Sequence, residues 1–161
     1  GVEQFKKLDG IIEDRVEKAS RLGTGLADLY GLRTPIVKEQ CTHVFYAYPL
    51  VLDIETLGCA RNRIFQALRA EGVPVSQGYT NIHLLPIFQE KIAYGRRGFP
   101  WSSDIYRGDV QYGKGICPIA EVLHDSTFLG IGISSYEYSN DEIDLIIEAF
   151  HKIWNNLDQL R

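Results

Sequence analysis

Apolar residues in the first thirty positions recur every three or four residues, with charged residues between them. This spacing predicts an amphipathic helix, because it places the apolar side chains on one stripe of a 3.6-residue turn. Gly23 and Gly25 interrupt the pattern before Leu26 and Leu29 resume it, so we expect a long helix that bends or breaks near Gly23. The apolar stripe comprises Phe5, Leu8, Ile12, Val16 and Ala19.

The pattern then alternates between strands and helices. Residues 43–52 are rich in β-branched and aromatic side chains, which predicts a strand in which Pro49 indicates an edge or a bulge. Helices are expected at 61–70 and 119–123, and short strands at 73–75 and 128–133. Ser139 and Glu142 have the spacing of a capping box and open a final helix. Its apolar face comprises Ile143, Ile146, Ile147, Phe150, Ile153, Trp154 and Leu157.

This order of elements predicts an α+β fold. We expect a small antiparallel or mixed sheet of about three strands, covered on one face by helices, with a long N-terminal helix. A length of 161 residues favours one domain over residues 1–161. Residues 94–116 contain several glycines and scattered aromatic side chains, and we interpret them as a long ordered loop of the functional or mobile kind.

Composition and charge exclude several classes of protein. Seventeen basic against 21 acidic side chains give a net charge of −4, the wrong sign for holding a nucleic acid by charge. No stretch reaches the ~20 apolar residues that span a bilayer, and no secretory signal opens the chain. The three widely separated cysteines form neither a metal-binding nor a disulfide pattern. We therefore expect a cytoplasmic protein without a metal site.

Familiar catalytic motifs are missing from the sequence. It contains no phosphate-binding glycine loop, no G-x-S-x-G elbow and no H-E-x-x-H pair, and Gly113-Lys114-Gly115 is interpreted as an exposed turn. Cys41 and His43 could supply a thiolate and a base, but at alternate positions of a strand a structural role is favoured. The first residue is Gly1 and the chain lacks methionine, so we expect a piece of a longer protein.

The densest polar cluster is residues 77–83, which follow a short strand and precede a helical turn. Loops at strand ends often carry ligand contacts because the scaffold holds them in place. Tyr79, Asn81 and His83 together offer a flat aromatic face and several hydrogen-bonding groups. From the residues alone, Tyr79 and His83 could equally well tie the loop to the domain.

Motifs along the whole chain resemble the C-terminal part of the DegT-type sugar aminotransferases, pyridoxal-phosphate enzymes of fold type I. Each motif is short, but their order and spacing match the family from end to end. They are Gln4-Phe5-x-x-Leu8-Asp9, Tyr30-Gly31-Leu32, His43-Val44-Phe45-Tyr46-x-Tyr48-Pro49, Arg61-x-x-Ile64-x-x-x-Leu68-x-x-Glu71-Gly72-Val73-Pro74, Tyr79-x-x-x-His83 with Pro86, Cys117-Pro118-x-Ala120-Glu121 and Ser139-Asn140-Asp141-Glu142.

The resemblance implies that residues 1–33 connect a large domain to this small one, and that the full-length enzyme is a homodimer that uses pyridoxal phosphate. It implies a sugar-nucleotide substrate bound by Tyr79 and His83, with Asn81 standing where the family often has proline. The family's Schiff-base lysine lies in the large domain, so we expect this chain to have no catalytic residue, no cofactor and no activity alone. None of its lysines has the family's Schiff-base context: Lys6, Lys7, Lys18, Lys38, Lys91, Lys114 and Lys152.

Two hypotheses about function follow. The first is the C-terminal domain of an enzyme that transfers an amino group from an amino acid such as glutamate to a keto-sugar, which we expect to be nucleotide-linked. The second is a non-catalytic binding or interaction module that retains the small-domain fold. A helix suited to bridging two domains favours the enzyme.

Overall fold

The computed structural model describes residues 1–78 and 80–160, which divide into two compact units. The first unit comprises residues 1–77 and 126–161, and the second comprises residues 78–125. The second unit is therefore an insertion between two strands of the first. The single domain that the sequence length favours contains this internal division.

The first unit is built on an antiparallel sheet with the strand order β1-β2-β4-β3. The strands are β1 (Leu32–Arg33), β2 (Tyr48–Leu52), β3 (Val75–Ser76) and β4 (Phe128–Ile131). In the central pair, Tyr48 lies opposite Ile131 and Val51 lies opposite Phe128. The α+β class is confirmed, but the sheet has four strands where the sequence predicted about three, because β1 is too short to give a periodic pattern.

Strand β2 begins at Tyr48, five residues later than the sequence predicted. Before it, Phe45 has a positive φ of 46°, and its N–H donates to His43 Nδ1 at 2.9 Å. The prediction that Cys41 and His43 share a strand is wrong, because this local turn replaces the extended backbone. Pro49 fits within β2 because β1 pairs only with Val51 and Leu52, so beside Pro49 the sheet continues only toward β4.

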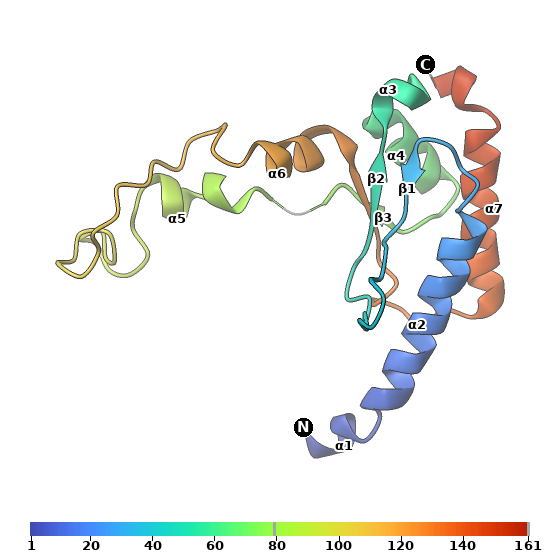
Figure 1. The fold of residues 1–161 in the computed structure, drawn as a ribbon, viewed down its shortest axis with the longest axis horizontal. Helices are drawn as coiled ribbons and strands as arrows, with labels where there is room; N and C mark the ends of the chain where they lie inside the picture. Colours follow the sequence, from blue (N-terminus) through green and yellow to red (C-terminus); the bar gives the residue numbers. More distant parts are fainter. Residues whose placement is uncertain (79, 161) are drawn as a thin grey trace. The chain divides into compact units, whose positions relative to one another are not determined.

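Helices α2 (Leu8–Gly25), α4 (Arg61–Ala70) and α7 (Asn140–Trp154) lie along the same side of the sheet in Figure 1. Strand β2 fits this arrangement, because Tyr48, Leu50 and Leu52 are buried while the alternate residues are half-buried. The helical elements of this unit are α1 (Val2–Phe5), α2 (Leu8–Gly25), α3 (Ile54–Leu57), α4 (Arg61–Ala70), α7 (Asn140–Trp154) and the 3₁₀ turn η3 (Leu157–Leu160). A π-helical turn, η2 (Leu123–Thr127), leads into β4.

Helix α2 ends at Gly25, two residues beyond the predicted break, and it does not resume. Leu26 and Leu29 are buried, but they lie in a turn and not in a helix. The prediction that the helix resumes after the glycines is therefore wrong. The N-terminal part of the apolar stripe is exposed, with Phe5 at 75%. The helix therefore buries apolar side chains against its own unit in its C-terminal half, where Ala19 and Leu22 are buried.

Helix α7 begins at the predicted capping box. Ser139 Oγ accepts from the Glu142 N–H at 3.2 Å, and Glu142 Oε2 accepts from the Ser139 N–H at 2.8 Å. The hydrogen bonds from Ser139 lower the pKa of the Glu142 carboxyl. The apolar face of α7 packs against α2 and α4, with all but one of its predicted members buried and Ile147 half-buried.

Among the described residues, we find no helix with the length and apolar character needed to cross a membrane. The thiol of Cys59 is buried and donates to the carbonyl oxygen of Leu160 at 3.4 Å. Cys41 is exposed.

Candidate functional site

The described residues of the inserted unit, 78 and 80–125, bury no apolar side chain. Its regular elements are the 3₁₀ turn η1 (Ile82–Leu84) and the short helices α5 (Pro86–Gln89) and α6 (Pro118–Val122). Among its described residues, the only buried ones are the polar Asn81, His83 and Glu121. Burial of polar side chains is costly unless they are hydrogen-bonded, so their partners decide how this unit is held together.

Glu121 is the centre of a buried hydrogen-bond cluster. Its Oε1 lies 2.9 Å from His83 Nε2. The Gly115 N–H donates to both carboxylate oxygens, at 2.8 and 2.9 Å, and the Cys117 N–H donates to Oε1 at 3.3 Å. One side chain therefore joins η1, the turn before α6 and the first turn of α6. We call these four residues the His83–Glu121 cluster.

The environment of Glu121 favours its ionised form. Burial alone raises the pKa of the carboxyl, but the N–H groups of Gly115 and Cys117, together with His83, lower the pKa by more. The net result is a pKa below the ordinary value of 4.5. The carboxylate therefore accepts hydrogen bonds over the whole neutral pH range.

Gln89 also holds the η1 turn in place. Its side-chain amide donates to the carbonyl oxygen of His83 at 2.7 Å and also to that of Tyr112. Phe88, Trp101 and Tyr112 pack with ring centroids 5.2 to 6.2 Å apart, and Trp101 Nε1 donates to the Tyr112 hydroxyl at 3.1 Å. Residues 94–116 contain turns and an isolated bridge between Tyr94 and Phe99, and these contacts tie them to η1 and α5.

The structure places two of the three residues singled out from the sequence in this cluster or beside it. His83 is a member, and Asn81 is buried two residues before it, where its carbonyl oxygen accepts from the Leu84 N–H at 3.0 Å. Tyr79 lies outside the described residues. Gly113–Gly115 is the exposed turn that the sequence predicted, although the Gly115 N–H has a specific acceptor.

Glu121 and Gln89 do not stand out in the sequence as partners of His83. One signal for Glu121 was present: an acidic side chain near the first turn of a helix can reach back to free backbone N–H groups. Glu121 does this toward Cys117 and Gly115 from the start of α6. Its link to His83, 38 residues earlier, has no local sequence signal.

At low pH the backbone amides of Gly115 and Cys117 are expected to lose their protection against hydrogen exchange. The folded-state pKa of Glu121 is lower than its unfolded value, so its contribution is complete above about pH 4.5 and is lost as pH falls through the lowered pKa. Exchange measured by NMR, corrected for the intrinsic pH dependence, checks this. Protection should become independent of pH in Glu121→Gln, and loss of protection near pH 6 would contradict the assignment to the carboxylate.

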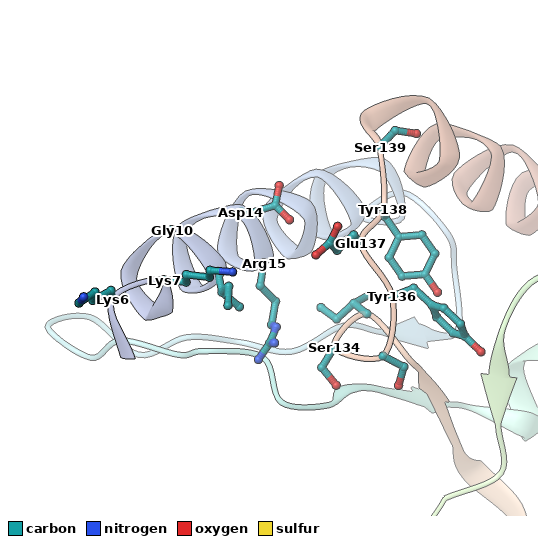
Figure 2. Close-up of a pocket in the computed structure, with 13 residues that line it drawn as sticks. Lys6, Lys7, Gly10, Asp14, Arg15, Ser134, Tyr136, Glu137, Tyr138 and Ser139 are labelled. Atoms are coloured by element: carbon teal, nitrogen blue, oxygen red, sulfur yellow. The ribbon is translucent and has the colours of Figure 1, made fainter. Parts of the chain in front are cut away.

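A second candidate site is a cavity of about 810 Å³ in the first unit, between α2 and residues 133–139. Figure 2 shows Lys7 and Arg15 on the helix wall and Glu137 on the opposite segment. Lys6 also lines the cavity, but its ammonium pairs with Glu3 at 2.7 Å. Acidic and basic side chains thus both line the cavity, so the charge of the lining favours neither an anionic nor a cationic ligand.

The described residues contain no cluster of three or more His, Cys, Asp or Glu side chains that could hold a metal ion. His83 and Glu121 have the required donor atoms, but Glu121 is already occupied by backbone N–H groups. A cation beside it would have to displace these donors.

Comparisons with known proteins show one consistent family. Residues 1–113 match the DegT/DnrJ/EryC1/StrS aminotransferase family. The chain is 30% identical over 159 residues to the spore coat polysaccharide biosynthesis protein SpsC of Bacillus subtilis, covering 98% of this chain and 36% of that protein.

Solved structures agree on the fold. The aminotransferase TlmJ from Streptoalloteichus hindustanus superposes with a TM-score of 0.67 at 20% identity, covering 98% of this chain and 36% of that one. The putative sugar aminotransferase Spr1654 from Streptococcus pneumoniae gives 0.68 at 19% identity, covering 98% and 34%. At these identities the likeness establishes the fold alone. The chain spans about a third of the length of these relatives.

Proposed function

Because the chain belongs to the DegT/DnrJ/EryC1/StrS aminotransferase family, we propose that it is the C-terminal, smaller domain of a pyridoxal-phosphate-dependent sugar aminotransferase. The complete enzyme transfers an amino group from an amino acid such as glutamate to a keto-sugar carried on a nucleotide. Support comes from the family match and from the relative SpsC, whose name refers to polysaccharide biosynthesis.

The described residues do not fit pyridoxal phosphate. This cofactor needs a nucleophilic lysine, an acidic partner for its ring nitrogen and a phosphate cradle. Lys18 is the buried lysine of the described chain, and its ammonium is engaged by Asp14 at 3.1 Å and Glu17 at 3.7 Å. The carboxylate of Asp14 is engaged in the same pair, so it is not free for a ring nitrogen. We propose that a large domain holds the cofactor.

The exposed stripe on α1 and α2 supports the proposed large domain. Val2, Phe5 and Leu8 are apolar and exposed, and a contiguous exposed apolar patch often marks an interaction surface. A large domain packed on this stripe would remove the apolar surface from water. A homodimer, which we propose for the full-length enzyme, would bury further surface of the same kind.

We propose that the turn containing Asn81 and His83 contacts the acceptor sugar, together with Tyr79. The observation that carries this proposal is the His83–Glu121 cluster itself. In a unit whose described residues bury no apolar side chain, His83 and Glu121 are buried and each has specific hydrogen-bond partners. An arrangement of this kind holds polar side chains in fixed positions, as substrate recognition requires.

In the full-length protein, His83→Ala is expected to raise the KM for the keto-sugar about two- to tenfold, the effect of one lost hydrogen bond. The half-reaction with the amino donor should be little changed, because the proton transfers of this chemistry belong to residues outside this chain. Stopped-flow spectroscopy of the cofactor with glutamate measures the first half-reaction, and steady-state kinetics with nucleotide-linked keto-sugars measure the second.

Glu90→Ala is the matched control, since Glu90 is an exposed side chain of the same unit. It should leave both half-reactions unchanged. An unchanged KM in His83→Ala, or loss of the donor half-reaction alone, would refute the assignment of His83. Failure of the unmodified protein to aminate any keto-sugar would refute the proposed function.

A further inference from the structure

We propose that Glu121 is a positioning residue that holds His83 in its Nε2–H tautomer, so that the neutral ring offers Nδ1 only as a hydrogen-bond acceptor. The group recognised by His83 is then a donor, such as a sugar hydroxyl. This second step rests on the proposed function, whereas the tautomer follows from the geometry of the chain.

The geometry around Glu121 leaves one direction for the hydrogen bond to His83. Backbone N–H groups can only donate, and those of Gly115 and Cys117 point at this carboxylate. The Gly115 N–H faces both oxygens, at 2.8 and 2.9 Å, so a proton on either oxygen would compete with a donor hydrogen. The carboxylate is therefore an acceptor, and His83 Nε2, 2.9 Å from Oε1, must carry the hydrogen.

His83 is held in place at its side chain and at its backbone. Its ring atom Nε2 is bound to Glu121, and its carbonyl oxygen accepts from the Gln89 side chain at 2.7 Å. The residue is only 8% exposed, so a turned-over ring would have to exchange a charge-assisted hydrogen bond for an unpaired nitrogen inside the unit. Tautomer and orientation are thus set together, as a second group sets them for metal-bound or catalytic histidines.

The consequence is a chemical preference. A neutral ring with Nε2–H accepts at Nδ1 and cannot donate there. It suits a hydroxyl, which brings a hydrogen, and it disfavours a phosphate or keto oxygen, which brings only lone pairs. We therefore assign His83 to a hydroxyl of the sugar and not to the phosphates of a nucleotide.

The test is NMR of the full-length protein with ¹⁵N-labelled histidine, which distinguishes the two ring nitrogens by their coupling to the ring carbon-bound protons. At pH 7.5 to 8 the His83 ring should show Nε2–H with an unprotonated Nδ1. In Glu121→Ala it should become a mixture of tautomers. In Glu121→Gln an amide oxygen at the position of Oε1 can still accept from His83 Nε2, so the Nε2–H form should persist, although the amide nitrogen at the position of Oε2 no longer accepts from the Gly115 N–H. Glu90→Ala is the control.

Kinetics with the keto-sugar substrate test the role in positioning. Glu121→Ala should raise the KM about two- to tenfold with kcat unchanged, and adding His83→Ala should cause no further increase, because Glu121 acts through His83. Glu121→Gln should restore the KM.

Two results would overturn the proposal: an Nδ1–H or doubly protonated ring in the unmodified protein, or the same tautomer in Glu121→Ala as in the unmodified protein. If the tautomer is as expected but no keto-sugar is aminated, the proposed function fails and the tautomer assignment stands. Additive effects of the two substitutions on the KM would refute the positioning role alone.

Discussion

Replacing Phe150 with alanine is expected to lower the free energy of unfolding of this chain by about 3–5 kcal/mol. Phe150 is fully buried on α7, and its ring packs against Trp154 with centroids 5.7 Å apart. The substitution removes a large apolar side chain from the region where α7 meets its neighbouring helices, and the surrounding side chains can fill the cavity only in part. Urea denaturation followed by circular dichroism measures the effect.

Leu145→Ala is the matched control on the same helix. Its side chain is 62% exposed, so truncation should change the free energy of unfolding by no more than about 0.5 kcal/mol. Similar effects for the two substitutions would show that α7 does not supply the core of the chain. If the dependence of the unfolding free energy on urea concentration is the same in both variants as in the unmodified chain, a change in the denatured state is excluded.

Gly25→Ala is expected to destabilise the chain by about 1–3 kcal/mol, although alanine is ordinarily the better helix former. A Cβ atom at Gly25 would lie 2.4 Å from Ile147 Cδ1 and within 2.9 Å of two further carbons of the same side chain. Helices α2 and α7 would have to separate, or Ile147 would have to leave its place between them. The measurement is the same denaturation experiment.

Ile147→Ala should relieve this clash, since it removes all three carbons that meet the new Cβ. The double variant Gly25→Ala, Ile147→Ala should therefore be less destabilised than the sum of the single variants. Additive effects would mean that close packing of the two helices is not what requires glycine at this position.

Much of the helical structure of the first unit could be predicted from the sequence. Helix α4 covers the predicted residues 61–70, and α7 starts at the predicted capping box, because both helices combine an apolar period with local end signals. The sheet was predicted less well. A two-residue strand such as β1 exists only through its pairing with Val51 and Leu52, and no local pattern records that pairing.

Only part of the candidate site could be predicted, because only some of its residues have a local signal in the sequence. Asn81 and His83 stand out as polar residues in a loop between regular elements, which is a local signal. Glu121 and Gln89 did not stand out, because their importance lies in which atoms they reach. Those atoms belong to residues from 83 to 117, and folding of the chain brings them within hydrogen-bond distance.

The sequence by itself determined the elements with a long apolar period, the α+β class and, through its motifs, the resemblance to an aminotransferase family. Only the tertiary structure decided that residues 78–125 form a separate unit whose described residues bury no apolar side chain, and that a carboxylate holds His83 there. The physical reason is that helix formation depends on neighbours three or four residues apart. The His83–Glu121 cluster depends on hydrogen bonds between segments up to 38 residues apart, which no local pattern encodes.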